Sequence, residues 1–124
     1  MQDEPTPAEL IKAVADFLRN EIVPQIKGHN AFKLRVGINA LDLVTRQLAL
    51  AEGGDAAEAA RLKQLLGTDG SLIELNRALS EKISTGEVDL QTPGLAEHLW
   101  RTTMDKLAVD QPNYASYKRE IGTK

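Results

Sequence analysis

The run from Phe32 to Leu50, FKLRVGINALDLVTRQLAL, is the longest strongly apolar stretch of the chain. At about 100° per residue, its apolar side chains cover more than half of a helical wheel, and four polar side chains fall inside a wedge of roughly 60°. These four residues, the polar wedge, are Arg35, Asn39, Asp42 and Arg46. A helix that is apolar over most of its circumference normally lies at the centre of a fold. The sequence therefore predicts an all-α fold around this segment.

Helix start and stop signals divide the rest of the chain into further helices. Thr6 and Glu9 form a capping box with a proline at the first helical position, and Pro24 ends or kinks the helix that follows. Gly53 and Gly54 are predicted to end the central helix. The predicted helices run from Thr6 to about Val23, from about Asn30 to Glu52, from Asp55 to Gly67, from Ser71 to Gly86 and from Thr92 to about Val109.

The length of 124 residues predicts a single domain of about five packed helices over residues 1–124. No stretch of alternating β-branched residues predicts a strand. Residues 113–124 are expected to form a partly ordered tail, in which Tyr114 docks on the bundle and the last few residues are frayed.

Several kinds of chemistry lack the residues that they need. The chain contains no cysteine, which excludes disulfides, thiolate zinc sites and cysteine nucleophiles. Its two histidines do not have metal-ligand spacing, its hydroxyl residues lack a nucleophile motif, and its glycines do not form a phosphate-binding loop. We therefore expect no catalytic residues, no metal and no cofactor, and the sequence favours a non-catalytic protein over an enzyme.

The charge pattern limits the kinds of partner. The formal net charge is −3, and acidic and basic residues are mixed evenly along both halves of the chain. Such a surface disfavours nucleic acids and anionic membranes as partners. The N-terminal residues lack the pattern of a signal peptide, and no apolar run approaches the roughly 20 residues that span a bilayer. These features predict a cytoplasmic protein.

The polar wedge has three interpretations from the sequence. It faces solvent, with Asp42 and Arg46 paired one turn apart. Alternatively, it forms a buried network with Glu21, a carboxylate that falls within the apolar stripe of the first predicted helix and needs a partner such as Arg35 or Arg46 if it is buried. In the third interpretation, the two arginines line a site for a carboxylate or phosphate ligand.

Three positions outside the wedge carry further expectations. His98 is predicted on the polar side of the last helix, near Glu97, Arg101 and Asp105, which form a solvated ladder. Trp100 is predicted in the core on the opposite side. Gly37 lies in the middle of the central helix, where glycine costs roughly 1 kcal/mol, and its presence there indicates a close approach of another helix.

Four segments, PTPAELIKAVADFL, RVGINALDLV, GSLIELNRAL and KLAVDQPNYASY, resemble in order a bacterial family of small helical proteins of unknown function. Members of that family are typically encoded beside aminoglycoside-phosphotransferase-like kinases and acyl-CoA dehydrogenases. The resemblance thus implies a helper role in acyl-CoA or hydroxyacyl-CoA metabolism, which is an association and not a mechanism. The matching segments draw attention to Arg35, Asn39, Asp110, Pro112 and Tyr114.

Two hypotheses of different classes follow. In the first, which the sequence favours, the chain is a non-catalytic interaction module that binds a phosphotransferase-like kinase or an acyl-CoA dehydrogenase, or that self-associates as a homo-oligomer. In the second, it is a small-molecule binding protein or weak enzyme. An anionic or acyl-CoA-type ligand would then be held by Arg35, Asn39 and Arg46, with Glu21 or Asp42 as the acid–base group.

Overall fold

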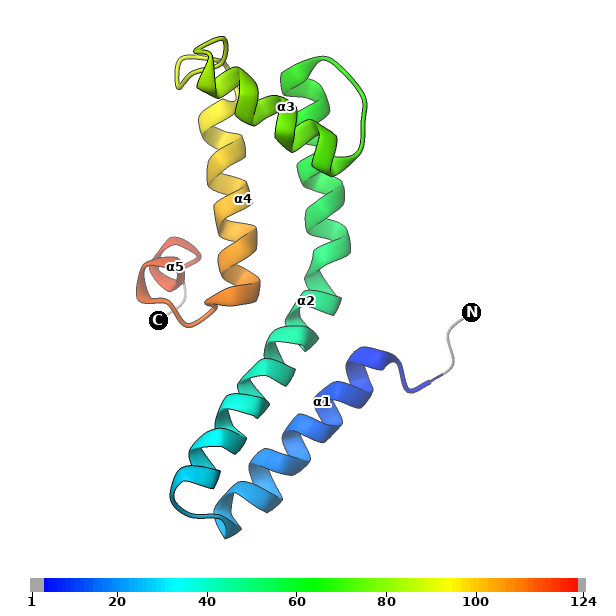
Figure 1. Cartoon of the computed structure of the whole chain (residues 1–124), viewed down its shortest axis with the longest axis vertical. Coiled ribbons are helices and arrows are strands. Elements are labelled where there is room, and N and C mark those ends of the chain that lie inside the picture. Colours follow the sequence, from blue (N-terminus) through cyan, green and yellow to red (C-terminus); the bar gives the residue numbers. More distant parts are fainter. Residues whose placement is uncertain (1–3, 123–124) are drawn as a thin grey trace. The chain divides into compact units, whose positions relative to one another are not determined.

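The computed structural model describes residues 4–122, and every regular element in that part of the chain is helical (Figure 1). The α-helices are α1 (Pro7–Phe17), α2 (His29–Leu66), α3 (Leu72–Ser84), α4 (Leu95–Asp110) and α5 (Ala115–Glu120). A π-helical turn, Leu18–Ile22, and a 3-10 turn, Val23–Gln25, follow α1. The all-α prediction is confirmed. Within residues 4–122, no helix combines the length and the apolar character that crossing a bilayer requires.

The chain divides into two compact units between Ala51 and Glu52. The first unit contains α1 and the N-terminal part of α2, and the second contains the rest of α2 with α3, α4 and α5. Each unit has its own buried apolar side chains.

The first unit is a helical hairpin. Thr6 caps α1 by accepting a hydrogen bond from the backbone N–H of Glu9 at 3.2 Å. Pro24 lies in the 3-10 turn, and Gly28, with a φ of 72°, reverses the chain before α2. The carbonyl of Gly28 then accepts hydrogen bonds from the first turn of α2. As a result, α1 and the start of α2 run side by side in opposite directions (Figure 1).

The two helices of the hairpin meet along a heptad-like row of positions, which we call the hairpin seam. Every seam side chain is buried or half-buried, and the spacing alternates between three and four residues, as in antiparallel helix pairs. The two helices bury little side-chain surface in the seam, because two of its buried residues, Ala15 and Ala31, are alanines. Its positions are Ala8, Ile11 and Ala15 on α1, Leu18 and Ile22 on the π-helical turn that follows, and Ala31, Leu34, Ile38, Leu41 and Thr45 on α2.

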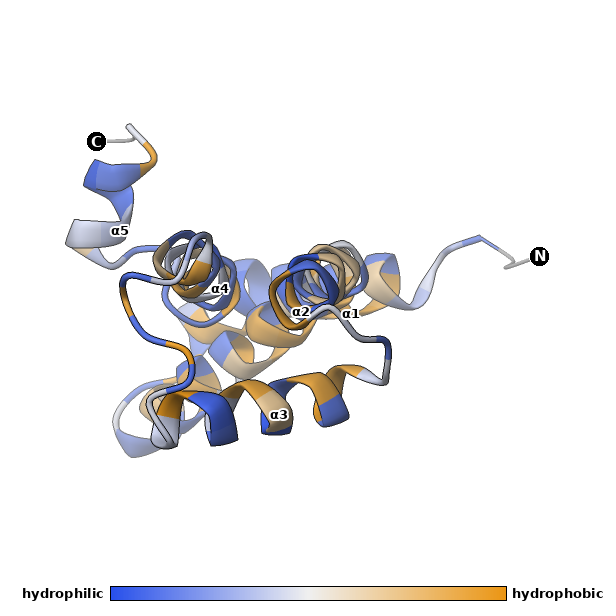
Figure 2. Cartoon of the chain, turned by 90° about the horizontal axis from the view of Figure 1, so that it is seen from above, coloured by the Kyte–Doolittle hydropathy of each residue, from blue (hydrophilic) through white to orange (hydrophobic). Residues whose placement is uncertain are grey.

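The second unit has a core built from larger side chains. Five buried residues form one cluster: Leu62, Leu75, Leu79, Val88 and Leu95. Leu66 and Leu72 are partly buried and pack against it. Ser71 and Glu74 form the predicted capping box at the start of α3. Apolar and polar residues lie on opposite sides of α3 (Figure 2), so this helix buries one stripe and exposes the other.

The predicted helix end at Gly53 and Gly54 is wrong, because α2 continues without a break to Leu66. Neither glycine has the positive φ that a glycine C-cap uses, whereas Gly67, with a φ of 66°, does follow the end of the helix. Good helix formers flank the pair in the sequence ALAEGGDAAEAARL. Their combined preference outweighs the roughly 1 kcal/mol that each interior glycine costs.

Two further boundaries differ from the prediction. Helix α4 begins at Leu95, because Thr92 caps a turn instead and accepts a hydrogen bond from the backbone N–H of Asp89 at 3.0 Å. Part of the predicted tail forms α5, whose last residues lead to Gly122. Fraying was predicted for the final residues, and residues 123–124 lie outside the described part of the chain. The five helices in the described residues are therefore not the five that the sequence predicted.

Candidate functional site

One side of the hairpin carries a chain of ion pairs, which we call the polar face. Lys12 Nζ lies 2.8 Å from Asp16 Oδ2, and Arg19 Nη1 lies 2.9 Å from Asp16 Oδ1. Arg19 also donates through Nη2 to Asp42 Oδ2 at 2.5 Å, which joins the π-helical turn after α1 to α2. These side chains are between 34% and 66% exposed. Ion pairs that remain this exposed contribute little to stability, so their main effect is to fix which sides of the two helices meet.

The ion pairs shift two pKa values in the expected directions. The hydrogen bond from Lys12 is the main cause that lowers the pKa of the Asp16 carboxyl, and the charge of Arg19 acts in the same direction. The hydrogen bond to Asp42 raises the pKa of Arg19 further above its ordinary value. Both groups therefore stay charged near neutral pH, and neither is available as an acid or base.

The polar wedge belongs to this polar face. Arg35 and Asn39 are exposed, which agrees with the solvent-facing interpretation. Asp42 pairs with Arg19, a partner that the sequence analysis did not consider. Arg46 is half-buried and has contacts of its own.

Glu21 does not have the surroundings that the network hypothesis requires. The buried-network interpretation, one of the three left open by the sequence, does not apply to Glu21, because this residue is exposed in the π-helical turn after α1. Its backbone carbonyl accepts a hydrogen bond from Gln25 Nε2 at 2.7 Å. Since Glu21 is solvated, no buried counter-charge is needed.

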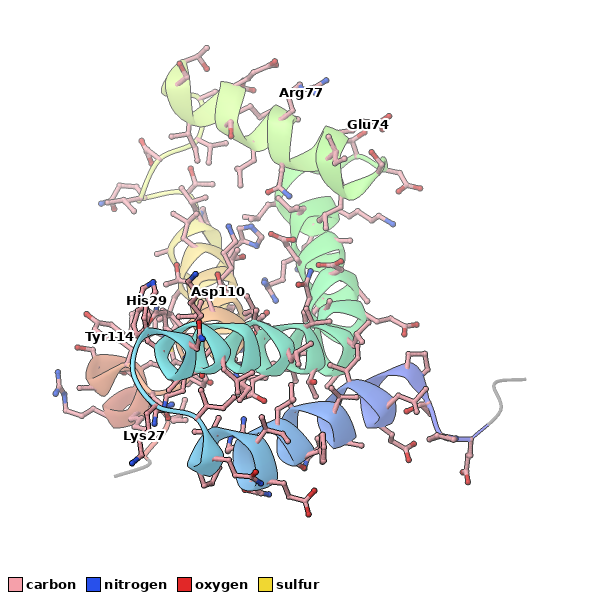
Figure 3. All side chains as sticks on the ribbon, turned by 60° about the horizontal axis from the view of Figure 1, so that its bottom comes forward. Lys27, His29, Glu74, Arg77, Asp110 and Tyr114 are labelled. Atoms are coloured by element: carbon pink, nitrogen blue, oxygen red, sulfur yellow. The ribbon has the colours of Figure 1, made fainter. Side chains whose placement is uncertain are left out.

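Asp110 and Tyr114 lie in the second unit, whereas the polar wedge lies in the first. Asp110 is the last residue of α4, and Tyr114 is the N-cap residue of α5, 51% exposed (Figure 3). The backbone N–H of Tyr114 donates to the carbonyl of Gln111 at 3.0 Å, so this segment forms a tight turn between the two helices.

A buried polar cluster in the second unit was not predicted. His98 is only 2% exposed, and among the described residues it is the buried polar side chain. Arg61 donates from Nε to His98 Nδ1 at 3.2 Å and from Nη2 to Thr102 Oγ1 at 3.3 Å. Because Nδ1 accepts this bond, the imidazole is neutral, with its proton on Nε2.

Burial is the largest cause that lowers the pKa of His98, and the positive charge of Arg61 adds to it. Glu58, on the preceding turn of α2, acts in the opposite direction. The prediction that His98 lies on the polar side of its helix is wrong. A sign was present in the sequence, because His98 follows the core residue Leu95 by three positions and so shares its side of α4.

Trp100 also differs from its prediction. It was expected in the core, but it is 53% exposed. It lies five residues after Leu95, which places it on the side of α4 away from the core cluster. An exposed tryptophan is unusual for a purely structural side chain.

The comparison with protein families assigns the chain to a group. A family model described as "Domain of unknown function (DUF6285)" matches residues 24–114. The chain belongs to the DUF6285 family. No curated protein and no solved structure matches it. The expected resemblance to a family of unknown function is confirmed in this form.

The DUF6285 match covers most of the features described above and leaves two helices outside. It begins in the 3-10 turn at Pro24 and ends at Tyr114, so it includes the polar wedge, the His98 cluster and Asp110. The first helix, α1, and the short helix α5 lie beyond its ends. The resemblance of the segment PTPAELIKAVADFL is therefore not part of the match.

The ionisable side chains described above are largely engaged within their own units. Among residues 4–122, no three histidine or carboxylate side chains form a group that could hold a metal ion. The His98 imidazole is enclosed and hydrogen-bonded to a guanidinium, and the polar-face carboxylates are engaged by cations. Large apolar side chains are exposed in both units.

Proposed function

We propose that this DUF6285 protein is a non-catalytic helical interaction module that binds another protein. The observation that carries the proposal is the exposure of Trp100, which is 53% exposed on the outer side of α4. Ile73 and Leu90 in the same unit are each 72% exposed. Interfaces are enriched in aromatic residues, and exposed tryptophans are the side chains that most often dominate binding energy.

The proposed partner is a phosphotransferase-like kinase or an acyl-CoA dehydrogenase, the enzymes that the family resemblance implies. The module would then assist an enzyme of acyl-CoA metabolism without a reaction of its own. Its near-neutral surface charge suits a protein partner better than a polyanion. Trp100 would anchor the contact.

The test is affinity purification of the tagged chain from its native cell, followed by identification of the proteins that co-purify. The proposal predicts that one of the two enzymes co-purifies, and that Trp100→Ala reduces its recovery at least tenfold. The matched control is Arg101→Ala, which changes the next, exposed residue and should leave the recovery unchanged. If neither enzyme is retained, or if both variants retain it equally well, the proposal is wrong.

A second candidate function is the binding of an anionic or acyl-CoA-type ligand at the polar wedge. The exposure of Arg35 and Asn39, one turn apart on α2, supports it, because a guanidinium can donate two hydrogen bonds to one carboxylate or phosphate. Of the two proposed acid–base groups, Asp42 is engaged by Arg19 and Glu21 is exposed. If Arg35→Ala leaves thermal shifts with acyl-CoA and phosphate compounds unchanged, this candidate fails.

A further inference from the structure

The two sides of the hairpin differ strongly in character. Viewed along α1, the ion-paired residues of the polar face lie about 90° to one side of the hairpin seam. On the other side, about 110° from the seam, α1 carries Leu10, Val14 and Phe17, spaced four and three residues apart. The same geometry, fixed by the Arg19–Asp42 pair, places Val44 and Leu48 of α2 on that side as well. We call these five residues the apolar face.

The apolar face is left open by its own unit. Leu10, Val14 and Leu48 are 50–52% exposed, Phe17 is 49% exposed and Val44 is 40% exposed. The hairpin fully buries only the small side chains of the seam and Ile38. Two helices that leave this much apolar surface in water need a further layer to complete a core.

The size of this surface is that of a large functional patch. The five residues of the apolar face together leave on the order of 500 Å² of side-chain surface exposed, in the upper part of the roughly 300–600 Å² range of the largest patch on a monomer, which is often functional.

Small residues adjoin the apolar face on α2, and they leave room for the larger side chains of an α1 helix from a second copy of the chain. Gly37 and Ala40 lie between Lys33 and Val44 on this side of α2, and a Cβ added at Gly37 would meet nothing within 4 Å. An interior glycine that contacts nothing in its own chain leaves room for a helix from outside. The apolar-face residues of α1, Leu10, Val14 and Phe17, have side chains large enough to fill this room.

The charges at the loop end of the apolar face are complementary as well. Glu21 lies four residues after Phe17, in the π-helical turn that follows α1, and Lys33 precedes Gly37 by four residues on α2. Both side chains are exposed. If two copies of the chain are related by a two-fold axis parallel to the helices, Glu21 faces the partner's Lys33. By symmetry, this pair of opposite charges occurs twice in the dimer. A two-fold axis perpendicular to the helices would instead bring Glu21 near the partner's Pro7, with no cation.

We propose that the apolar face binds the same face of a second copy of the chain, so that two hairpins form an antiparallel four-helix bundle. Each α1 packs on the partner's α2, with Leu10 near the partner's Val44 and Phe17 near the partner's Gly37. The inference rests on the proposed function, because it names self-association as one of the contacts of the module. The site of the enzyme contact, Trp100, lies in the other unit.

The experiment is sedimentation equilibrium of the full chain, whose monomer mass is 13.6 kDa. The wild type should sediment as a dimer at about 100 μM and dissociate on dilution, as expected for a typical interface. Val14→Glu should raise the dimer dissociation constant at least tenfold. The matched control Ala13→Glu adds the same charge at the neighbouring exposed position and should have no such effect.

A charge exchange tests the two-fold arrangement. Glu21→Lys and Lys33→Glu should each weaken the dimer, and the double variant should restore it, because the two charges face each other across the axis. Circular dichroism checks that each variant keeps its helical content, and Leu10→Lys serves as a second disruptive variant if Val14→Glu does not fold.

Three outcomes overturn the inference. In the first, the wild type is monomeric at all concentrations and Val14→Glu only lowers its thermal stability. The chain's own second unit would then cover the apolar face. The second is a monomer whose enzyme partner is lost with Val14→Glu, since another protein would cover it. The third is a dimer that the charge exchange does not restore. If Trp100→Ala abolishes co-purification of the enzyme and Val14→Glu does not, that result tests the proposed function and not the dimer.

Discussion

The two units of the chain bury their apolar residues to very different degrees. The second unit encloses a cluster of leucines and a valine, centred on Leu62 and Leu75, which are 0% and 2% exposed. The hairpin of the first unit closes its seam mainly with Ala15 and Ala31. Since hydrophobic stabilisation scales with buried apolar area, the second unit holds most of the stability of an isolated chain. The inference that another surface completes the hairpin rests on this difference.

The largest effect that tests this contrast is expected from Leu62→Ala. Leu62 is fully buried in the core cluster, so its truncation should lower the free energy of unfolding by about 3 kcal/mol. The comparison is Leu48→Ala in the hairpin, measured by urea denaturation at a concentration that keeps the chain monomeric. Leu48 is 51% exposed, and its truncation should cost much less. Equal losses for the two variants would remove the distinction between the units.

Acid pH should destabilise the second unit through His98. Burial lowers the pKa of His98 in the folded chain, so the unfolded chain binds the proton more readily. This contribution to stability is complete above the unfolded pKa of about 6.5 and is lost as the pH falls through the lower folded pKa. Urea denaturation at several pH values should therefore show a loss that is smaller in His98→Gln. A wild type and a variant with the same pH dependence would contradict the assignment.

The capping box of α3 should contribute a smaller amount. Ser71 accepts a hydrogen bond from the backbone N–H of Glu74 at 3.2 Å, and Ser71→Ala should cost about 1 kcal/mol of global stability. The equivalent change in the hairpin, Thr6→Ala, should mainly fray the first turn of α1. Circular dichroism with urea denaturation separates a shifted midpoint from a local loss of helix. A large global effect of Thr6→Ala would show that α1 is more tightly coupled to the fold than its burial indicates.

The smallest effect is expected from Asp42→Asn. It removes the ion pair with Arg19, but both side chains are substantially exposed and the pair is screened by salt. The denaturation midpoint at physiological salt should stay within experimental error. A clear destabilisation that persists in 1 M salt would mean that the polar face contributes more to the hairpin than its exposure indicates.

Local chemistry made most helix starts readable from the sequence. The Thr6 cap and the Ser71 capping box are both present, because a side chain that satisfies an orphan N–H acts within one turn and needs no tertiary context. At Thr6 the box is half formed, since the Glu9 carboxylate accepts from the Thr6 hydroxyl and not from its backbone N–H. The pair Gly53 and Gly54 misled the prediction, because a glycine ends a helix only where the chain turns away.

The ion-pair and hydrogen-bond partners of the polar residues could not be predicted from local sequence. The Arg19–Asp42 pair depends on the register between two helices, which the sequence of either helix alone does not define. His98 and Trp100 were assigned to the wrong sides of α4, although the spacing from Leu95 distinguishes them once that core residue is known. The exposure of the apolar face was also hidden, because an apolar stripe has the same sequence pattern in a core and in an interface.

Hydrogen exchange measured at two protein concentrations tests the central claim most directly. If a second copy completes the hairpin, the amide protection of α1 and of residues 29–51 should rise with concentration, while the protection of α3 and α4 stays constant. If the protection of α1 is the same at both concentrations in a range that spans the dimer dissociation constant, the hairpin is complete within one chain and the claim is wrong.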